Sequence, residues 1–200
     1  MVAESQDYSF DGNLIYMNPG YVNEGILKAF ISTKGIVYYH GYFCNQIYIK
    51  LIQDILKKEI VFPQLVDSSS LQYESMIKNT ESVALHIRRG DFVACGRAVS
   101  PEKYAMALVQ MDEKYGDTAT YFVFSDDLAW CSGHEDEIGI SGVAGEVIYV
   151  QANYGNGNNY IDMQLMSLCK HMIISNSSFG LWAYYLNETK DLDVIYVNKL

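Results

Sequence analysis

The stretch SVALHIRRGDFV, residues 82–93, decides how this 200-residue chain folds. It begins as a short, continuously apolar run, which is typical of a strand buried in a parallel sheet. It then becomes polar at Arg88, Arg89 and Asp91. Two adjacent arginines at the end of a buried strand need a partner, because an unpaired buried charge is costly. The candidates are a bound anion, an ion pair that organises the loop, and an Arg-Gly-Asp adhesion signal.

The chain after this stretch alternates apolar strands with helices. Residues 100–116 carry complete helix signals: Ser100 as N-cap, Pro101 at the first helical position and Gly116 after the last turn. The alternation predicts an α/β fold with a parallel sheet covered on both faces. The expected strands are 82–87, 119–125, 146–150, 172–175 and 192–197, and the expected helices are 100–116, 126–134, 158–171 and 177–187.

The first part of the chain is less regular. Residues 35–46 are β-rich, and residues 45–62 have apolar side chains at helical spacing. Pro63 and the sequence VDSSS interrupt that pattern, which indicates a boundary near residues 63–80.

Composition excludes several classes of protein. Half of the residues are hydrophobic and 19% are charged, which argues against disorder, and the net charge of −10 argues against a general binder of nucleic acid or anionic lipid. We see no signal peptide and no apolar run long enough for a bilayer, so we expect a cytoplasmic protein. The cysteines contain no CxxC pair and are expected to be buried thiols rather than zinc ligands. They are Cys44, Cys95, Cys131 and Cys169.

Polar residues follow three of the expected strands. HIRRGD ends the first strand, FSDD the second and ISNSS the fourth. Because the carboxyl ends of parallel strands meet at one edge of a sheet, where such folds bind ligands, these residues are expected to converge.

The arginine pair leaves two interpretations open. Arginine binds phosphate oxygens two at a time, and strand alternation sends Arg88 and Arg89 to opposite faces, so one of them suffices for a ligand. The other interpretation is an Arg–Asp ion pair that holds the loop. His86 shares a face with Arg88 and is either a core histidine or a ligand donor. Asp91 is expected to orient the arginines.

The polar residues after the second and the fourth expected strand also leave two interpretations open. Ser125 is followed by Asp126 and Asp127, which resemble a metal-binding carboxylate pair. Capping of the following helix is favoured for this pair, with one carboxylate left for a ribose or base. Asn176, Ser177 and Ser178 precede a helix and form either an anion site or an ordinary N-cap. The sequence YGNGNNY, residues 154–160, is expected to be a flexible loop, with the substrate as a candidate for what it faces.

Three motifs resemble a known family. HIRRGD, FSDDLAWC and DMQLMSLCKHMIISNSSFGLWAYYL are similar, in order and spacing, to those of the α-1,2-fucosyltransferases of glycosyltransferase family 11, especially the bacterial ones. The similarity covers roughly residues 35–190. It implies a Rossmann-like parallel sheet, the donor-binding half of a GT-B-type glycosyltransferase, in residues 81–200. Residues 1–80 would then be a remnant of the acceptor domain and a connecting segment.

The resemblance also implies an activity. The donor would be GDP-L-fucose and the acceptor the 2-hydroxyl of a terminal galactose, with inversion, no metal and no cofactor. Arg88 would bind the β-phosphate and stabilise the leaving diphosphate; the catalytic base is not identified. The implied donor-binding residues are His86, Arg88, Arg89, Asp91, Ser125, Asp126, Asp127, Asn176, Ser177, Ser178 and Phe179.

The chain departs from the family pattern at three places. It lacks an N-terminal GGLGNQ turn and stops early, so it is expected to be truncated at both ends, and Gly180 and Leu181 stand where bulkier residues are usual. The alternative function is therefore a GDP-sugar-binding module or fragment without turnover. No nucleic acid is expected as a partner, and peripheral association with the cytoplasmic face of a membrane is compatible with the sequence.

Overall fold

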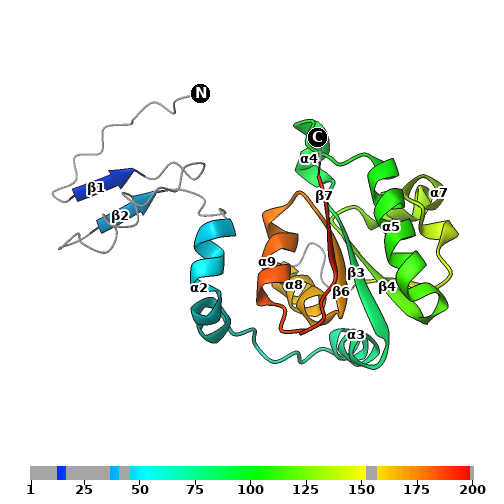
Figure 1. Cartoon of the computed structure of the whole chain (residues 1–200), viewed down its shortest axis with the longest axis horizontal. Helices are drawn as coiled ribbons and strands as arrows, with labels where there is room; N and C mark the ends of the chain where they lie inside the picture. The colour runs from blue at the N-terminus through cyan, green and yellow to red at the C-terminus, as the bar shows by residue number, and fades with distance from the viewer. Residues whose placement is uncertain (1–12, 17–36, 41–45, 152–156, 199–200) are drawn as a thin grey trace. The chain divides into compact units, whose positions relative to one another are not determined.

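The computed structural model describes residues 13–16, 37–40, 46–151 and 157–198 (Figure 1). The chain divides into two compact units, Met1–Asp54 and Ile55–Leu200. The expected division at residue 80 concerns acceptor and donor functions and stays a prediction. In the first unit, β1 (Asn13–Tyr16) pairs in parallel with β2 (Val37–His40). Helix α2 (Gln46–Glu59) follows, where the sequence predicted a helix.

The second unit is built on a five-stranded parallel sheet with the order β5-β4-β3-β6-β7. β3 is the first of these strands in the sequence and lies at the centre. The chain winds outward from it in one direction and then returns to add β6 on its other side. This is a Rossmann-like arrangement, which confirms the predicted fold class, and its topological switch point lies between β3 and β6. The strands are β3 (Glu81–Ile87), β4 (Ala119–Ser125), β5 (Glu146–Tyr149), β6 (His171–Ser175) and β7 (Val194–Val197).

Helices cover both faces of this sheet (Figure 1). Helices α5 and α7 lie on one face, and α8 and α9 lie together on the other. Two short 3₁₀ turns, Gly116–Thr118 and Ile140–Gly142, join elements on the α5 side. The helices of this unit are α3 (Ser68–Asn79), α4 (Gly90–Ala94), α5 (Pro101–Tyr115), α6 (Leu128–Gly133), α7 (Glu135–Ile138), α8 (Asn159–Leu168) and α9 (Ser178–Leu186).

Alternation along β3 separates the two faces. Val83, Leu85 and Ile87 belong to one hydrophobic core with residues of α5, and all three are at most 1% exposed. His86 points the other way, where Gly180 of α9 packs directly against its ring. Because side chains alternate in a strand, Arg88, two positions after His86, lies on the same α8–α9 side of the sheet.

Helix α3 was not predicted from the sequence. Its SSSLQYESMIKN sequence buries just Ser70 and Ile77, so it carries little amphipathic signal, and Asp67 begins the helix by accepting a hydrogen bond from the Ser70 amide. Helix α8 also ends three residues earlier than expected, because His171 already belongs to β6.

The expectation of buried cysteines is right in two of the three described cases. Cys131 and Cys169 are fully buried, whereas Cys95 is exposed because it follows the short helix α4 in a polar loop. Cys44, most of the β-rich segment 35–46 and residues 154–156 of the expected loop lie outside the described residues.

Candidate functional site

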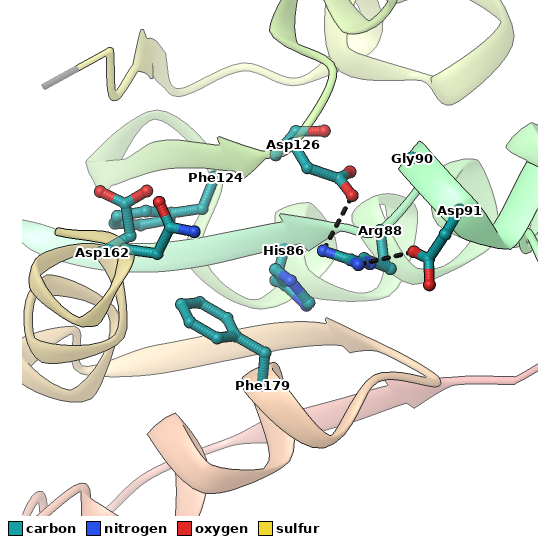
Figure 2. Close-up of a pocket in the computed structure, with 10 residues that line it drawn as sticks. His86, Arg88, Gly90, Asp91, Phe124, Asp126, Asp162 and Phe179 are labelled. Carbon is teal, nitrogen blue, oxygen red and sulfur yellow. Dashed lines mark hydrogen bonds and ion pairs between the residues drawn. The ribbon is translucent and has the colours of Figure 1, made fainter. Parts of the chain in front are cut away.

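A cavity of about 320 Å³ lies at the switch point of the sheet. It is open at the carboxyl ends of the strands, and ten residues line it (Figure 2). A volume of about this size accommodates a small ligand. The lining residues are His86, Arg88, Gly90, Asp91, Phe124, Ser125, Asp126, Asn159, Asp162 and Phe179.

Arg88 is the cationic group of this lining. Its Nη2 lies 2.6 Å from Asp91 Oδ1 and its Nη1 lies 2.9 Å from Asp126 Oδ2, and Figure 2 shows the guanidinium held between the two carboxylates. Its Nε is buried and has no hydrogen-bond partner among the described residues. The Arg–Asp ion pair, one of the two interpretations of the sequence, is therefore present, and the same guanidinium lines the cavity. Phosphate binding, the other interpretation, stays a prediction.

The two carboxylates differ in how firmly they are held. The side chain of Asp126 is 13% exposed, and its Oδ1 accepts a hydrogen bond of 2.8 Å from the Arg89 amide. Gly90 leaves room for it, since a Cβ there would stand 2.5 Å from Asp126 Oδ2. The Asp91 side chain is 68% exposed and forms an ion pair with Arg88. Asp91 is therefore the carboxylate that a ligand could displace at lower cost.

Arg89 turns away from the cavity. Its guanidinium carbon lies 3.4 Å from the centroid of the Trp130 ring, and its Nε donates to Asp127 Oδ2 over 3.3 Å. Asp127 Oδ1 accepts a hydrogen bond from the Trp130 amide, so this residue caps α6 as the sequence predicted. Ser125 Oγ accepts from the Asp127 amide.

His86 is a buried, neutral histidine. It is 4% exposed, and its Nδ1 lies 3.1 Å from Ser175 Oγ. Burial, and secondly the charge on Arg88, lowers the pKa of His86 to about 3. The ring can therefore exchange hydrogen bonds with a ligand without adding charge to the site. The Phe179 ring lies 5.8 Å away, in a tilted arrangement.

The polar residues that follow β6 support the cavity from outside. Ser177 caps α9 through a hydrogen bond from the Phe179 amide, and Asn176 Nδ2 donates to the carbonyl of Arg97. Ser178 is the first residue of α9 and is exposed. Among the expected site residues that follow β6, Phe179 is the one that lines the cavity. Ligand contacts from all the expected donor-binding residues stay predictions, and five of those residues do not line the cavity: Arg89, Asp127, Asn176, Ser177 and Ser178.

Three lining residues were not expected from the sequence: Gly90, Phe124 and Asp162. A fourth, Asn159, belongs to the segment YGNGNNY, for which the substrate was the candidate neighbour. Asn159 and Asp162 lie in the first turn of α8. A helix that follows a parallel strand begins at the carboxyl edge of the sheet, so polar residues of its first turn were available as a signal. In Figure 2, Phe124 and Asp162 lie on the side of His86 away from Asp91.

The described part of the chain holds neither a metal-binding cluster nor a helix that could span a membrane. No cluster of three or more histidine, cysteine or acidic side chains there could hold a metal ion. Among the described helices, none has the length and apolar character needed to cross a bilayer.

The sheet order and the switch-point cavity place this protein among the Rossmann-like α/β proteins. Comparison of its sequence with protein families finds a match to Glycosyl transferase family 11 over residues 17–200. The chain belongs to this family.

Known relatives agree with that assignment. An Escherichia coli alpha-1,2-colitosyltransferase is 32% identical over 160 residues, which are 78% of this chain and 53% of that protein. A second E. coli relative, the O-antigen biosynthesis glycosyltransferase WbnK, is 32% identical over 64% of this chain and 42% of its own length. The galactoside 2-alpha-L-fucosyltransferase Sec1 of Mus musculus is 27% identical over 75% of this chain and 42% of its own. The chain thus spans about half the length of these relatives.

Proposed function

We propose that this chain is the donor-binding half of a galactoside α-1,2-fucosyltransferase. In this proposal the cavity binds GDP-L-fucose, and the fucose passes to the 2-hydroxyl of a terminal galactose with inversion and without a metal or cofactor. Residues 81–200 bind the donor, and residues 1–80 belong to the acceptor part and its connection. The observation that carries the proposal is the guanidinium of Arg88, which lies in the switch-point cavity of a chain from this family.

The chemistry explains why one arginine matters so much. The acceptor hydroxyl oxygen forms a bond to the anomeric carbon and gives up its proton to a base that the described residues do not identify. At the same time the bond from that carbon to the β-phosphate oxygen breaks, and its electron pair leaves with GDP. Negative charge therefore grows on the diphosphate in the transition state. A guanidinium placed in advance stabilises that charge, and such electrostatic preorganisation is usually the largest contribution to catalysis.

The remaining lining residues fit the rest of the donor. Phe124 and Phe179 offer apolar surface to the sugar or the base, and the Asp162 carboxylate accepts hydrogen bonds from N–H groups of a nucleobase. Neutral His86 adds a hydrogen bond beside the diphosphate and places no second positive charge next to Arg88.

The transferred sugar has a second candidate. One relative with 32% identity is named an alpha-1,2-colitosyltransferase, so a colitose nucleotide belongs beside GDP-L-fucose in the assay. The alternative to an enzyme is a module that binds the GDP-sugar without turnover.

The first test is thermal stabilisation by GDP. Saturation at about one hundred times the dissociation constant stabilises a folded protein by about 2.7 kcal/mol, which raises the melting temperature by several degrees. We expect this shift in the wild type and its loss in Arg88→Ala. Arg97→Ala is the matched control, because Arg97 is exposed and does not line the cavity. Equal shifts in wild type and Arg88→Ala would contradict the proposed site.

The second test measures transfer to lactose and N-acetyllactosamine beside a full-length relative. Product with the fucose nucleotide supports the enzyme, and binding without product selects the module. Chelation of metals in a parallel reaction tests the proposed metal independence, which a strong loss of rate would contradict.

A further inference from the structure

The two adjacent arginines serve different surroundings. Arg88 lines the cavity, whereas the side chain of Arg89 is 17% exposed and lies against the first turn of α6. The 3.4 Å from its guanidinium carbon to the centroid of the Trp130 ring places the cation directly over the indole face. That geometry is a cation–π contact, and tryptophan is the strongest aromatic partner for it.

A second ring completes the arrangement. The His134 ring lies 4.4 Å from the Trp130 ring at an interplanar angle of 21°. At these distances the guanidinium and the imidazole cannot share one face of the indole, so Trp130 lies between them. His134 Nδ1 lies 2.8 Å from the Trp130 carbonyl oxygen. Because a carbonyl can only accept, Nδ1–H is the donor, and this bond fixes the imidazole plane.

Hydrogen bonds tie this Arg89–Trp130–His134 stack to the backbone of the cavity. Asp127 joins both partners, since Oδ1 accepts from the Trp130 amide and Oδ2 from Arg89 Nε. The Arg89 amide donates to Asp126, whose other oxygen pairs with Arg88. The peptide that links the two arginines is thus held at its amide and, through the Arg89 side chain, at the indole.

We propose that Trp130 is a positioning residue of the donor site, which acts through Arg89 to fix the place from which Arg88 reaches the diphosphate. The proposal rests on the proposed function above. Trp130 itself does not line the cavity. Its contribution therefore depends on its aromatic face over Arg89 rather than on contact with the ligand.

The competing explanation is that Trp130 only packs against the neighbouring core, which it does contact. Trp130→Phe and Trp130→Leu separate the two explanations, because both keep a large apolar side chain and only the first keeps an aromatic face. Trp182→Phe is the control: Trp182 lies on α9 with its ring against Tyr185, away from Arg89.

The experiment measures GDP affinity by calorimetry, together with urea unfolding, for each variant. We expect Trp130→Leu to weaken GDP binding by about three- to thirty-fold, Trp130→Phe to fall in between, and Trp182→Phe to leave it unchanged. In an Arg89→Met background, Trp130→Leu should cause no further loss, because its effect passes through Arg89. If Trp130→Leu does not fold, Trp130→Phe and His134→Ala carry the test, with a smaller loss of affinity expected from each.

The outcomes distinguish this inference from the proposed function. If GDP binds the wild type but not Arg88→Ala, and the Trp130 variants bind as tightly as the wild type, the positioning role is wrong while the donor site stands. Equal affinities for the Phe and Leu variants, or additive effects in the Arg89→Met background, also overturn it. If the wild type does not bind GDP, both proposals fall.

Discussion

Gly180 lies at the third position of α9, where the helix meets His86 of the sheet. A Cβ built there would stand 2.6 Å from His86 Nδ1 and 3.3 Å from Ile174 Cβ. Gly180→Ala therefore inserts one methyl group between a helix and two neighbouring strands. No unusual backbone angle is involved, because Gly180 is not among the described glycines with positive φ.

Two effects of this substitution oppose each other. Helix propensity favours alanine over glycine in a helix interior by about 0.5–1 kcal/mol. Steric crowding acts against it, since overpacking a filled interior costs about 1–3 kcal/mol. His86 has little freedom to move, because it is buried, bonded to Ser175 and close to Phe179. We expect crowding to dominate and the free energy of unfolding to fall by about 1.2 kcal/mol, the difference between the midpoints of these two ranges.

Urea unfolding of the variant and the wild type measures this difference. Gly133→Ala is the matched control, because Gly133 ends α6 and a Cβ there would have no neighbour within 4 Å. We expect the control to lie within about 0.5 kcal/mol of the wild type. A Gly180→Ala protein that is as stable as the wild type, or more stable, would refute the close packing of α9 against His86. GDP binding should weaken in the same variant, since His86 lines the cavity.

Three further predictions concern charges and thiols. Asp91→Asn should raise GDP affinity by up to about fivefold, because an exposed ion pair of about 0.2–1 kcal/mol no longer competes for Arg88, and a weaker affinity by calorimetry would contradict this. The folded pKa of His86 is about 3 against 6.5 for an ordinary histidine, so the stability due to its neutral state is complete above pH 6.5 and falls as the pH drops toward 3. That loss is about 1 kcal/mol between about pH 6.5 and 5.5 and approaches about 1.4 kcal/mol per pH unit below that range, and urea unfolding should show it in the wild type but not in His86→Gln. Brief alkylation near about pH 8, followed by peptide mass spectrometry, should modify exposed Cys95 and spare Cys131, whose pKa burial raises to about 11; equal labelling would disprove the burial of Cys131.

The sequence predicted most of the sheet and six of the ten residues that line the cavity. The bounds of strand β4 and helix α5 agree closely with the prediction. A continuous apolar run determines the strand locally, and a complete set of caps determines the helix. Helix α3 could not be predicted in that way, since its place depends on packing against α8 rather than on its own apolar pattern. Chain order alone therefore gave the architecture but not all of its layers.

The missed part of the cavity has a different physical cause. The expected residues follow strands directly, and the rule for parallel sheets brings them together. Asp162 comes from the first turn of a helix that is separated from β5 by a long connection, so no motif next to a strand points to it, and only the rule that such a helix begins at the carboxyl edge of the sheet does. Phe124 is a strand residue whose apolar side chain does not differ in the sequence from those of the core, and only the position of the end of β4 beside the cavity distinguishes it.

The charges at the site show how an acidic protein could still bind a diphosphate. The guanidinium groups of Arg88 and Arg89 face the carboxylates of Asp91, Asp126 and Asp127, so this cluster carries a net charge of minus one. A diphosphate added to the intact cluster would be repelled. Asp91 is the exposed member, and its withdrawal leaves a neutral cluster in which Asp126, held by the Arg89 amide, still supports one side of Arg88. The exchange of one carboxylate for a phosphate keeps the number of strong hydrogen bonds on Arg88 constant, so the empty site stays ordered and the ligand needs little reorganisation to enter.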